Sequence, residues 1–184
     1  MRLRPFITLL PALLLAGCAS SPSIQPVEQV DIPRFMGSWY VIAHVPGPLD
    51  RDPYNAVEHY ERRADGRIAT TYRQRPGGFD APVKTMHPLG RVRAGHGNAV
   101  WDMRVVWPIQ SEYVVVALAP DYSDTVVARS RRDYAWIMAR TPTLPPARYD
   151  ALVAKLAALG YDTTRLRRVP QRWPEARAAG SGIR

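Results

Sequence analysis

Between residues 39 and 140 the chain alternates between short apolar runs and turn-forming residues. The runs are rich in β-branched and aromatic side chains, and Gly, Pro, Asp and Asn stand between them, a pattern that predicts strands rather than helices. The predicted strands are 39–45, 55–63, 67–75, 83–93, 99–106, 112–119, 125–129 and 134–140. The pattern therefore predicts an all-β domain.

The connections between these runs differ in character. Asp65-Gly66 is typical of a tight hairpin turn, whereas residues 46–54 form a longer, Pro-containing connection. In an up-and-down arrangement successive turns lie at opposite ends. Eight antiparallel strands can close into a barrel wide enough for one small ligand. A β-sandwich is the alternative, and local pattern alone does not separate the two.

The periodicity changes after residue 140. Pro145 and Pro146 are suited to the first turn of a helix, and Gly160 to its C-terminal cap. Between them lies one apolar stripe at helical spacing: Tyr149, Leu152, Val153, Leu156 and Leu159. We expect this helix to pack on the outside of the barrel; a membrane-binding or partner helix is the alternative. A short strand near 166–169 and a disordered basic tail over 173–184 are expected to follow.

The N-terminus carries a targeting signal. Arg2 and Arg4 precede an apolar run over 6–16, which is too short to span a membrane and is typical of a signal peptide. Leu15-Ala16-Gly17-Cys18 resembles the bacterial lipoprotein processing box, in which the cysteine becomes the acylated first residue. We therefore expect a signal peptide over 1–17, lipidation of Cys18 and a flexible tether over 18–30. An ordinary secretory peptide with a chance cysteine is the alternative.

Charge and cysteine content narrow the possible partners. The formal net charge is +9, and loss of Arg2 and Arg4 with the signal peptide leaves +7, which favours anionic partners. Export argues against nucleic acid. Cys18 is the only cysteine, so no disulfide forms within the chain.

Catalytic patterns are weak. The four histidines, His44, His59, His87 and His96, lack metal-ligand spacing, so we expect neither a metal nor a cofactor. Glu58 and Glu61 form a possible carboxylate pair, but residues three apart on a strand face opposite sides. We expect both to be solvated and to form salt bridges, and we expect the protein not to be an enzyme.

Three short segments together resemble the signatures of the lipocalins, and of the bacterial outer-membrane lipocalins in particular. They are Gly37-Ser38-Trp39-Tyr40, Asp121-Tyr122 and Arg140 at the end of the last predicted strand. The second is degenerate, because Pro120 stands where the family often has Thr. The resemblance covers roughly 32–170. It implies an eight-stranded antiparallel up-and-down barrel over 31–172 with a C-terminal α-helix packed outside.

The resemblance also implies roles for individual residues. Trp39 would point inward at the closed end with Arg140 packed across it, and Gly37, Asp121 and Tyr122 would complete this floor. Candidate ligand-binding residues in the cavity are aromatic side chains and methionines: Tyr60, Tyr72, Trp101, Met103, Trp107, Tyr113, Tyr134, Trp136 and Met138.

The function implied is binding, storage or transport of a fatty acid, lysophospholipid or similar molecule in the cell envelope. Ala19 and Ser20 after Cys18 resemble lipoproteins sorted to the outer membrane, with the barrel on its periplasmic side. Two alternatives remain: a lipocalin-fold enzyme acting on a bound lipid, and a solidly packed barrel that serves as an interaction module. The oligomeric state, monomer or homodimer, is left open.

Overall fold

A computed structural model describes residues 22–175. The expected signal peptide, Cys18 and most of the expected C-terminal tail lie outside the described residues. Among residues 22–175, no helix is both long enough and apolar enough to cross a bilayer.

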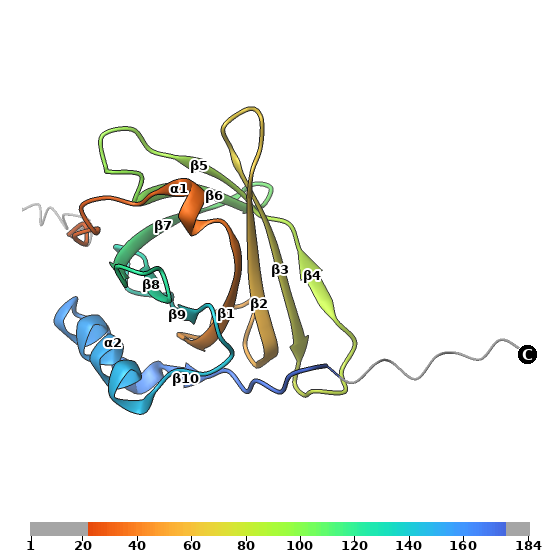
Figure 1. Ribbon diagram of the computed structural model, residues 1–184. Coiled ribbons are helices and arrows are strands. Elements are labelled where there is room, and N and C mark those ends of the chain that lie inside the picture. The colour runs from red at the N-terminus through yellow and green to blue at the C-terminus, as the bar shows by residue number, and fades with distance from the viewer. Residues whose placement is uncertain (1–21, 176–184) are drawn as a thin grey trace, which may run out of the picture.

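The strands form one continuous antiparallel sheet that closes on itself (Figure 1). Its order is β10-β1-β2-β3-β5-β6-β7-β8-β9, β4 pairs with β3, and β1 also pairs with β9. This last pairing makes a closed eight-stranded barrel and excludes the sandwich. The strands are β1 (Gly37–His44), β2 (Pro53–Arg62), β3 (Ile68–Pro76), β4 (Lys84–Met86), β5 (Leu89–Val92), β6 (Val100–Val106), β7 (Ile109–Leu118), β8 (Asp124–Ala128), β9 (Ala135–Ala139) and β10 (Arg167–Arg168).

The predicted strand 83–93 is interrupted. Its two halves, β4 and β5, both pair with β3, and Pro88 lies between them. Proline has no backbone N–H to donate to the sheet. Its carbonyl still accepts a hydrogen bond from the Thr70 N–H at 3.0 Å. The two halves therefore remain one bent segment of the barrel wall.

In the described part of the chain, three helical segments accompany the barrel: α1 (Ile32–Phe35), α2 (Pro146–Ala158) and the 3-10 turn η1 (Thr163–Arg165). α2 lies along the outside of the barrel, as expected (Figure 1). Its residues Leu152 and Leu156 are buried in the outer core. The expected short strand is β10, which pairs with β1. Pro145 precedes α2 without a side-chain cap.

The connections divide the barrel into two ends. The floor end carries α1 and the turns at 63–67, 93–99 and 119–123. The open end carries the loops at 45–52, 77–83, 107–108 and 129–134. Side chains alternate between two cores, one inside the barrel and one between its outer face and α2. In β9, for example, Met138 belongs to the inner core and Ile137 to the outer one.

The expectation of a free tether through residue 30 is wrong for residues 22–30. Ile24 and Val30 are buried: Ile24 packs into the outer core and Val30 into the inner one. The Val27 N–H donates to the Val115 carbonyl at 2.8 Å, and the Val30 N–H to the Gly97 carbonyl at 2.7 Å. At the start of the segment, Arg132 Nη1 donates to the Pro22 carbonyl at 3.1 Å. The segment therefore runs from the open end, beside the 129–134 loop, to the floor end.

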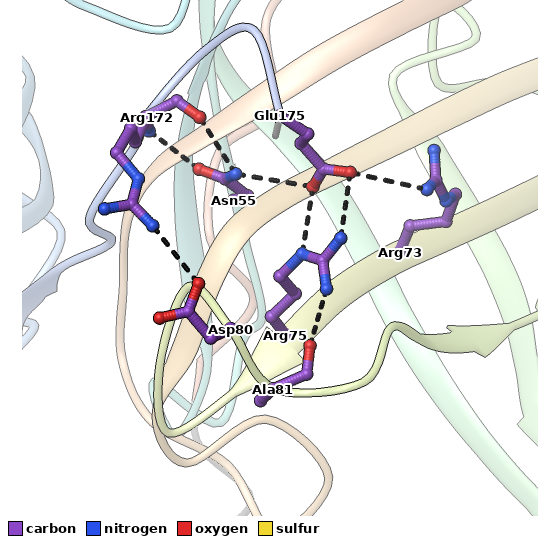
Figure 2. A network of polar contacts seen from close by, with 7 residues as sticks. All are labelled: Asn55, Arg73, Arg75, Asp80, Ala81, Arg172 and Glu175. Atoms are coloured by element: carbon purple, nitrogen blue, oxygen red, sulfur yellow. Dashed lines mark hydrogen bonds and ion pairs between the residues drawn. The ribbon is translucent and has the colours of Figure 1, made fainter. Parts of the chain in front are cut away.

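The expected disordered tail is likewise wrong for residues 173–175. The Trp173 ring packs edge-on against Tyr40, with centroids 5.3 Å apart. Figure 2 shows Glu175 accepting hydrogen bonds from Asn55 Nδ2 and from Arg75 Nε and Nη2, each at 3.3 Å. These contacts hold the segment against the outside of β1, β2 and β3. They depend on side chains far away in the sequence.

Candidate functional site in the barrel interior

Trp39 and Arg140 form the floor of the barrel. Trp39 is fully buried, and its Nε1 donates to the Phe35 carbonyl at 2.8 Å. The guanidinium of Arg140 lies over the indole ring, and its two amino groups donate to the carbonyls of Ser38 and Arg34, each at 2.8 Å. Gly37 has a φ of +90°, a conformation that favours glycine. The side chain of Arg140 therefore connects α1 to the first strand.

Asp121 and Tyr122 lie in the turn beside this floor. The Tyr122 hydroxyl accepts a hydrogen bond from the Asp31 N–H at 2.8 Å, and the guanidinium of Arg34 lies 4.1 Å from the Tyr122 ring centroid. Asp121 Oδ1 accepts from the Ser123 N–H at 3.0 Å. Hydrogen bonding from the Ser123 side chain, and then from its backbone, lowers the pKa of this carboxyl. The second signature thus joins the β7–β8 turn to the N-terminal cap of α1.

Directly above the floor lies a packed aromatic layer. Tyr60, Trp101 and Tyr113 contact one another, and the Trp101 and Tyr113 rings are stacked with centroids 4.7 Å apart. Phe35 of α1 reaches the same layer, 5.5 Å from Trp101. Met103 and Met138 are buried in the same core. These predicted wall residues are therefore brought together, but as close-packed neighbours.

A second aromatic group lies nearer the open end. The Tyr72 and Trp136 rings stack with centroids 5.5 Å apart, and Tyr134 lies 5.1 Å from Trp136. Trp136 and Met138 have the same parity on β9, and Met138 is inside the barrel. Tyr72 is buried, whereas Trp136 retains some exposed surface. Solvent therefore reaches an inward-facing indole through the open end.

Trp107 does not line the interior. It lies at the tip of the β6–β7 hairpin and is 82 % exposed. Its prediction as a cavity residue is wrong, because β6 ends at Val106 and the hairpin tip that follows is exposed, as are Val106 and Ile109 beside it. Trp107 belongs to the rim of the open end.

Glu58 is a buried residue of the site that sequence reasoning assigned to solvent. It is 1 % exposed, and the Tyr60 hydroxyl donates to its carboxyl group. Burial, together with the nearby charge of Asp50, raises the pKa of Glu58 to about 8. Glu61 is exposed, so the two glutamates do face opposite sides. Parity was the available signal: Glu58 lies two residues before the inward-facing Tyr60.

Asp50 is a second buried carboxyl in the barrel interior. It comes from the 45–52 loop, which folds inward at the open end, and it is 2 % exposed. Its carboxyl group accepts hydrogen bonds from the Gly47 N–H at 3.2 Å and from the Tyr134 hydroxyl, and it lies 3.3 Å from His44 Nδ1. No strand pattern could have indicated that a loop aspartate enters the barrel.

Three inward-facing side chains of β3 have a polar atom without a hydrogen-bond partner among the described residues. They are Thr70 Oγ1, the Tyr72 hydroxyl and Gln74 Oε1. Alternation along β3 places all three on the buried face of the strand. Buried polar atoms are normally paired, so these three mark polar surface that a ligand or water can satisfy. Within residues 22–175, no group of three metal-ligating side chains comes together.

The comparisons with known proteins agree with this geometry. Residues 30–171 match the family model described as a lipocalin-like domain. The chain belongs to the lipocalin-like family. It is 27% identical to the outer membrane lipoprotein Blc of Vibrio cholerae over 92% of this chain and 99% of that protein. It is 28% identical to temperature-induced lipocalin-1 of Arabidopsis thaliana over 80% of this chain and 83% of that protein.

Solved structures give the same fold for this lipocalin. Insecticyanin of the tobacco hornworm Manduca sexta superimposes with a TM-score of 0.64, covering 84% of this chain and 87% of that one at 14% identity. The expected family and barrel are thereby confirmed. At this identity the structural likeness concerns the fold alone.

Proposed function

We propose that this lipocalin binds one small apolar or amphiphilic molecule inside its barrel, between the aromatic layer and the open end. The observation that carries the proposal is Trp136, an inward-facing indole stacked on Tyr72 that solvent still reaches. Such a surface gains free energy when an apolar chain covers it, roughly 25 cal/mol per Å². In the cell envelope this binding would serve lipid storage or transport, with fatty acids and lysophospholipids as the ligand classes.

The test is a titration of delipidated protein with lysophospholipids of graded chain length, followed by intrinsic Trp fluorescence. Affinity is expected to rise with chain length and then level off when the chain fills the site. Trp136→Ala should weaken binding at least about tenfold, a loss of about 1.4 kcal/mol. Trp107→Ala removes an exposed tryptophan at the rim and serves as the matched control. Absence of saturable binding at any length would favour the solidly packed barrel.

An enzyme acting on a bound lipid is distinguished by turnover. Glu58 is the buried acid that such a reaction would use. If the protein only binds its ligand, the bound lipid should remain chemically intact after incubation. Mass spectrometry of the recovered ligand reads this directly. Turnover that disappears in Glu58→Gln would replace the binding proposal with the enzymatic one.

We also propose that the protein is anchored in the outer membrane through acylated Cys18. The processing box supports this, as does the relative named an outer membrane lipoprotein. Two or more acyl chains make a stable anchor. Cys18→Ser is expected to abolish acylation and to release a folded barrel from the membrane fraction. Unchanged mass and unchanged fractionation of the variant would exclude this anchor.

The open end of the barrel is proposed to face that membrane. Cys18 lies four residues before Pro22, which is bound to Arg132 of the open end, so the anchor can lie at most about 14 Å from the rim. The exposed large apolar side chains of the described residues all lie at this end: Leu49, Val83, Val106, Trp107 and Ile109. Arg131 lies at the same end and is 76 % exposed; its guanidinium pairs with Asp133 at 3.4 Å and could also meet anionic head groups.

Vesicles of phosphatidylethanolamine and phosphatidylglycerol with brominated acyl chains test this orientation. In the acylated protein we expect bromine to quench a component of the Trp fluorescence that is lost in Trp107→Phe and kept in Trp136→Phe. Equal quenching in the wild type and Trp107→Phe would place the rim away from the bilayer.

A further inference from the structure

We infer that the barrel interior holds the polar end of its ligand beside Tyr72 and Glu58, and that it selects an uncharged hydroxyl group over a carboxylate. This inference rests on the proposed ligand binding and names the head group of the same site; of the two ligand classes proposed above, it disfavours the fatty acids. It follows from three features of the interior: its unpartnered polar atoms, its two carboxyl groups and the absence of buried lysine and arginine among residues 22–175.

The unpartnered atoms give the site its hydrogen-bonding capacity. Thr70, Tyr72 and Gln74 are 2 %, 1 % and 3 % exposed, and each has a polar side-chain atom without a partner. They include two hydroxyls, which can donate or accept, and one amide oxygen, which can only accept. Leaving such a group unpaired in the folded protein is unfavourable. A ligand hydroxyl can donate to one of them and accept from another.

Tyr72 brings one of these unpartnered hydroxyls next to the two buried carboxyl groups. Tyr72 lies directly opposite Glu58 in the pairing of β3 with β2. Its ring stacks on Trp136, whose Nε1 donates to the Asp50 carboxyl at 3.4 Å. Glu58 is held by the Tyr60 hydroxyl, which also lies 2.8 Å from the Tyr113 hydroxyl. The ligand's polar group would therefore enter an ordered arrangement of hydroxyl and carboxyl groups.

The charge of this arrangement decides which head group it accepts. The buried ionisable side chains of residues 22–175, tyrosines aside, are His44, Asp50, Glu58 and Asp124, with no lysine or arginine among them. Asp124 is paired with Arg148 of α2 on the outside of the barrel. A ligand carboxylate at this site would be a buried negative charge without a buried lysine or arginine to pair with, and it could only accept hydrogen bonds.

The experiment compares decanol with decanoate, which share a chain length and differ in the head group. Both are titrated at pH 7.5 into the delipidated protein, below their critical micelle concentrations. Decanol is expected to bind at least about tenfold more tightly. Decanoate binding as tightly as decanol would overturn the inference while leaving the proposed binding function intact. If neither ligand binds, and lysophospholipids also fail, the proposed function itself fails.

Tyr72→Phe tests the assigned contact, because it keeps the ring on Trp136 and removes only the hydroxyl. It should lower the preference for decanol several-fold, and Tyr149→Phe on the outside of the barrel should leave that preference unchanged. Thr70→Val, an isosteric change, provides a second variant if Tyr72→Phe folds poorly. An unchanged ratio in folded Tyr72→Phe and Thr70→Val would show that water, not ligand, satisfies these groups and would overturn the inference.

Discussion

The guanidinium carbon of Arg140 lies 3.7 Å from the centroid of the Trp39 ring, at the point where the first and last strands of the barrel meet. Arg140 also donates hydrogen bonds to carbonyls of α1 and β1, and Trp39 donates to Phe35 of α1. The pair therefore holds three elements together: the short helix and both strands of the closing seam. Loss of either residue affects all three.

Removal of Trp39 is expected to be the more costly change. Trp39→Ala deletes a fully buried ring and should lower the free energy of unfolding by about 3–5 kcal/mol. Arg140→Ala should cost less, and the double variant should fall short of the sum because the two side chains share a contact. Urea denaturation of the four proteins measures this coupling. Arg131→Ala is the control, since its side chain is exposed and should change stability by less than about 0.5 kcal/mol. A coupling energy of zero would contradict a packed pair.

Gly97 controls the docking of residues 22–30. A Cβ at this position would lie 1.8 Å from the Glu28 carbonyl oxygen, a backbone atom that cannot move aside without displacing the segment. Gly97→Ala should therefore detach residues 22–30 and make them cleavable by a protease. Gly95, in the same turn, also has a positive φ but has open space around its Cβ direction. Gly95→Ala should therefore lower stability through backbone strain alone and should leave residues 22–30 protected from the protease.

Glu58 should make stability depend on pH. Its pKa is near 4.5 in the unfolded chain and about 8 in the folded protein, so between these values the folded state retains a proton that the unfolded state has lost. Stability must then fall as pH rises through this window, by an amount on the order of a few kcal/mol. In Glu58→Gln this component of the pH dependence should disappear. The exposed Glu61→Gln should retain it. Parallel pH profiles for the wild type and Glu58→Gln would show that the carboxyl titrates normally.

Leu156 anchors α2 to the barrel. Its side chain is buried in the outer core, and Leu156→Ala should lower the free energy of unfolding by about 2–5 kcal/mol. Lys155→Ala changes the neighbouring exposed position and should be nearly neutral. Both values come from the same denaturation experiment. Equal effects would mean that the helix does not pack through this stripe.

Much of the fold could be predicted because local sequence patterns determine which side chains of each strand and helix are buried. Alternation placed Met138 and Trp136 on one face of the last strand, and helical spacing identified Leu152 and Leu156 as the buried side of α2. Closure of the sheet could not be derived from pattern alone, because it depends on pairing between β1 and β9, which are far apart in sequence. The family signatures supplied that information.

The site was predicted less completely, and the misses have physical causes. Glu58 was assigned to solvent because a carboxylate is rarely buried, although its parity with Tyr60 indicated the interior. Asp50 and the 173–175 segment depend on the path of irregular chain, which has no periodicity to read. Trp107 was assigned to the cavity from its residue type, yet residue type does not say whether a hairpin tip turns inward.

The floor built by α1, Trp39 and Arg140 has a consequence for kinetics. Because the barrel is closed at its floor, a ligand enters and leaves through the open end alone. A second ligand can therefore bind only after the bound one has dissociated. Exchange is then governed by departure, and its rate does not increase with the concentration of the competing molecule. The residence time of a bound ligand is then the same at low and high concentrations of competing ligand.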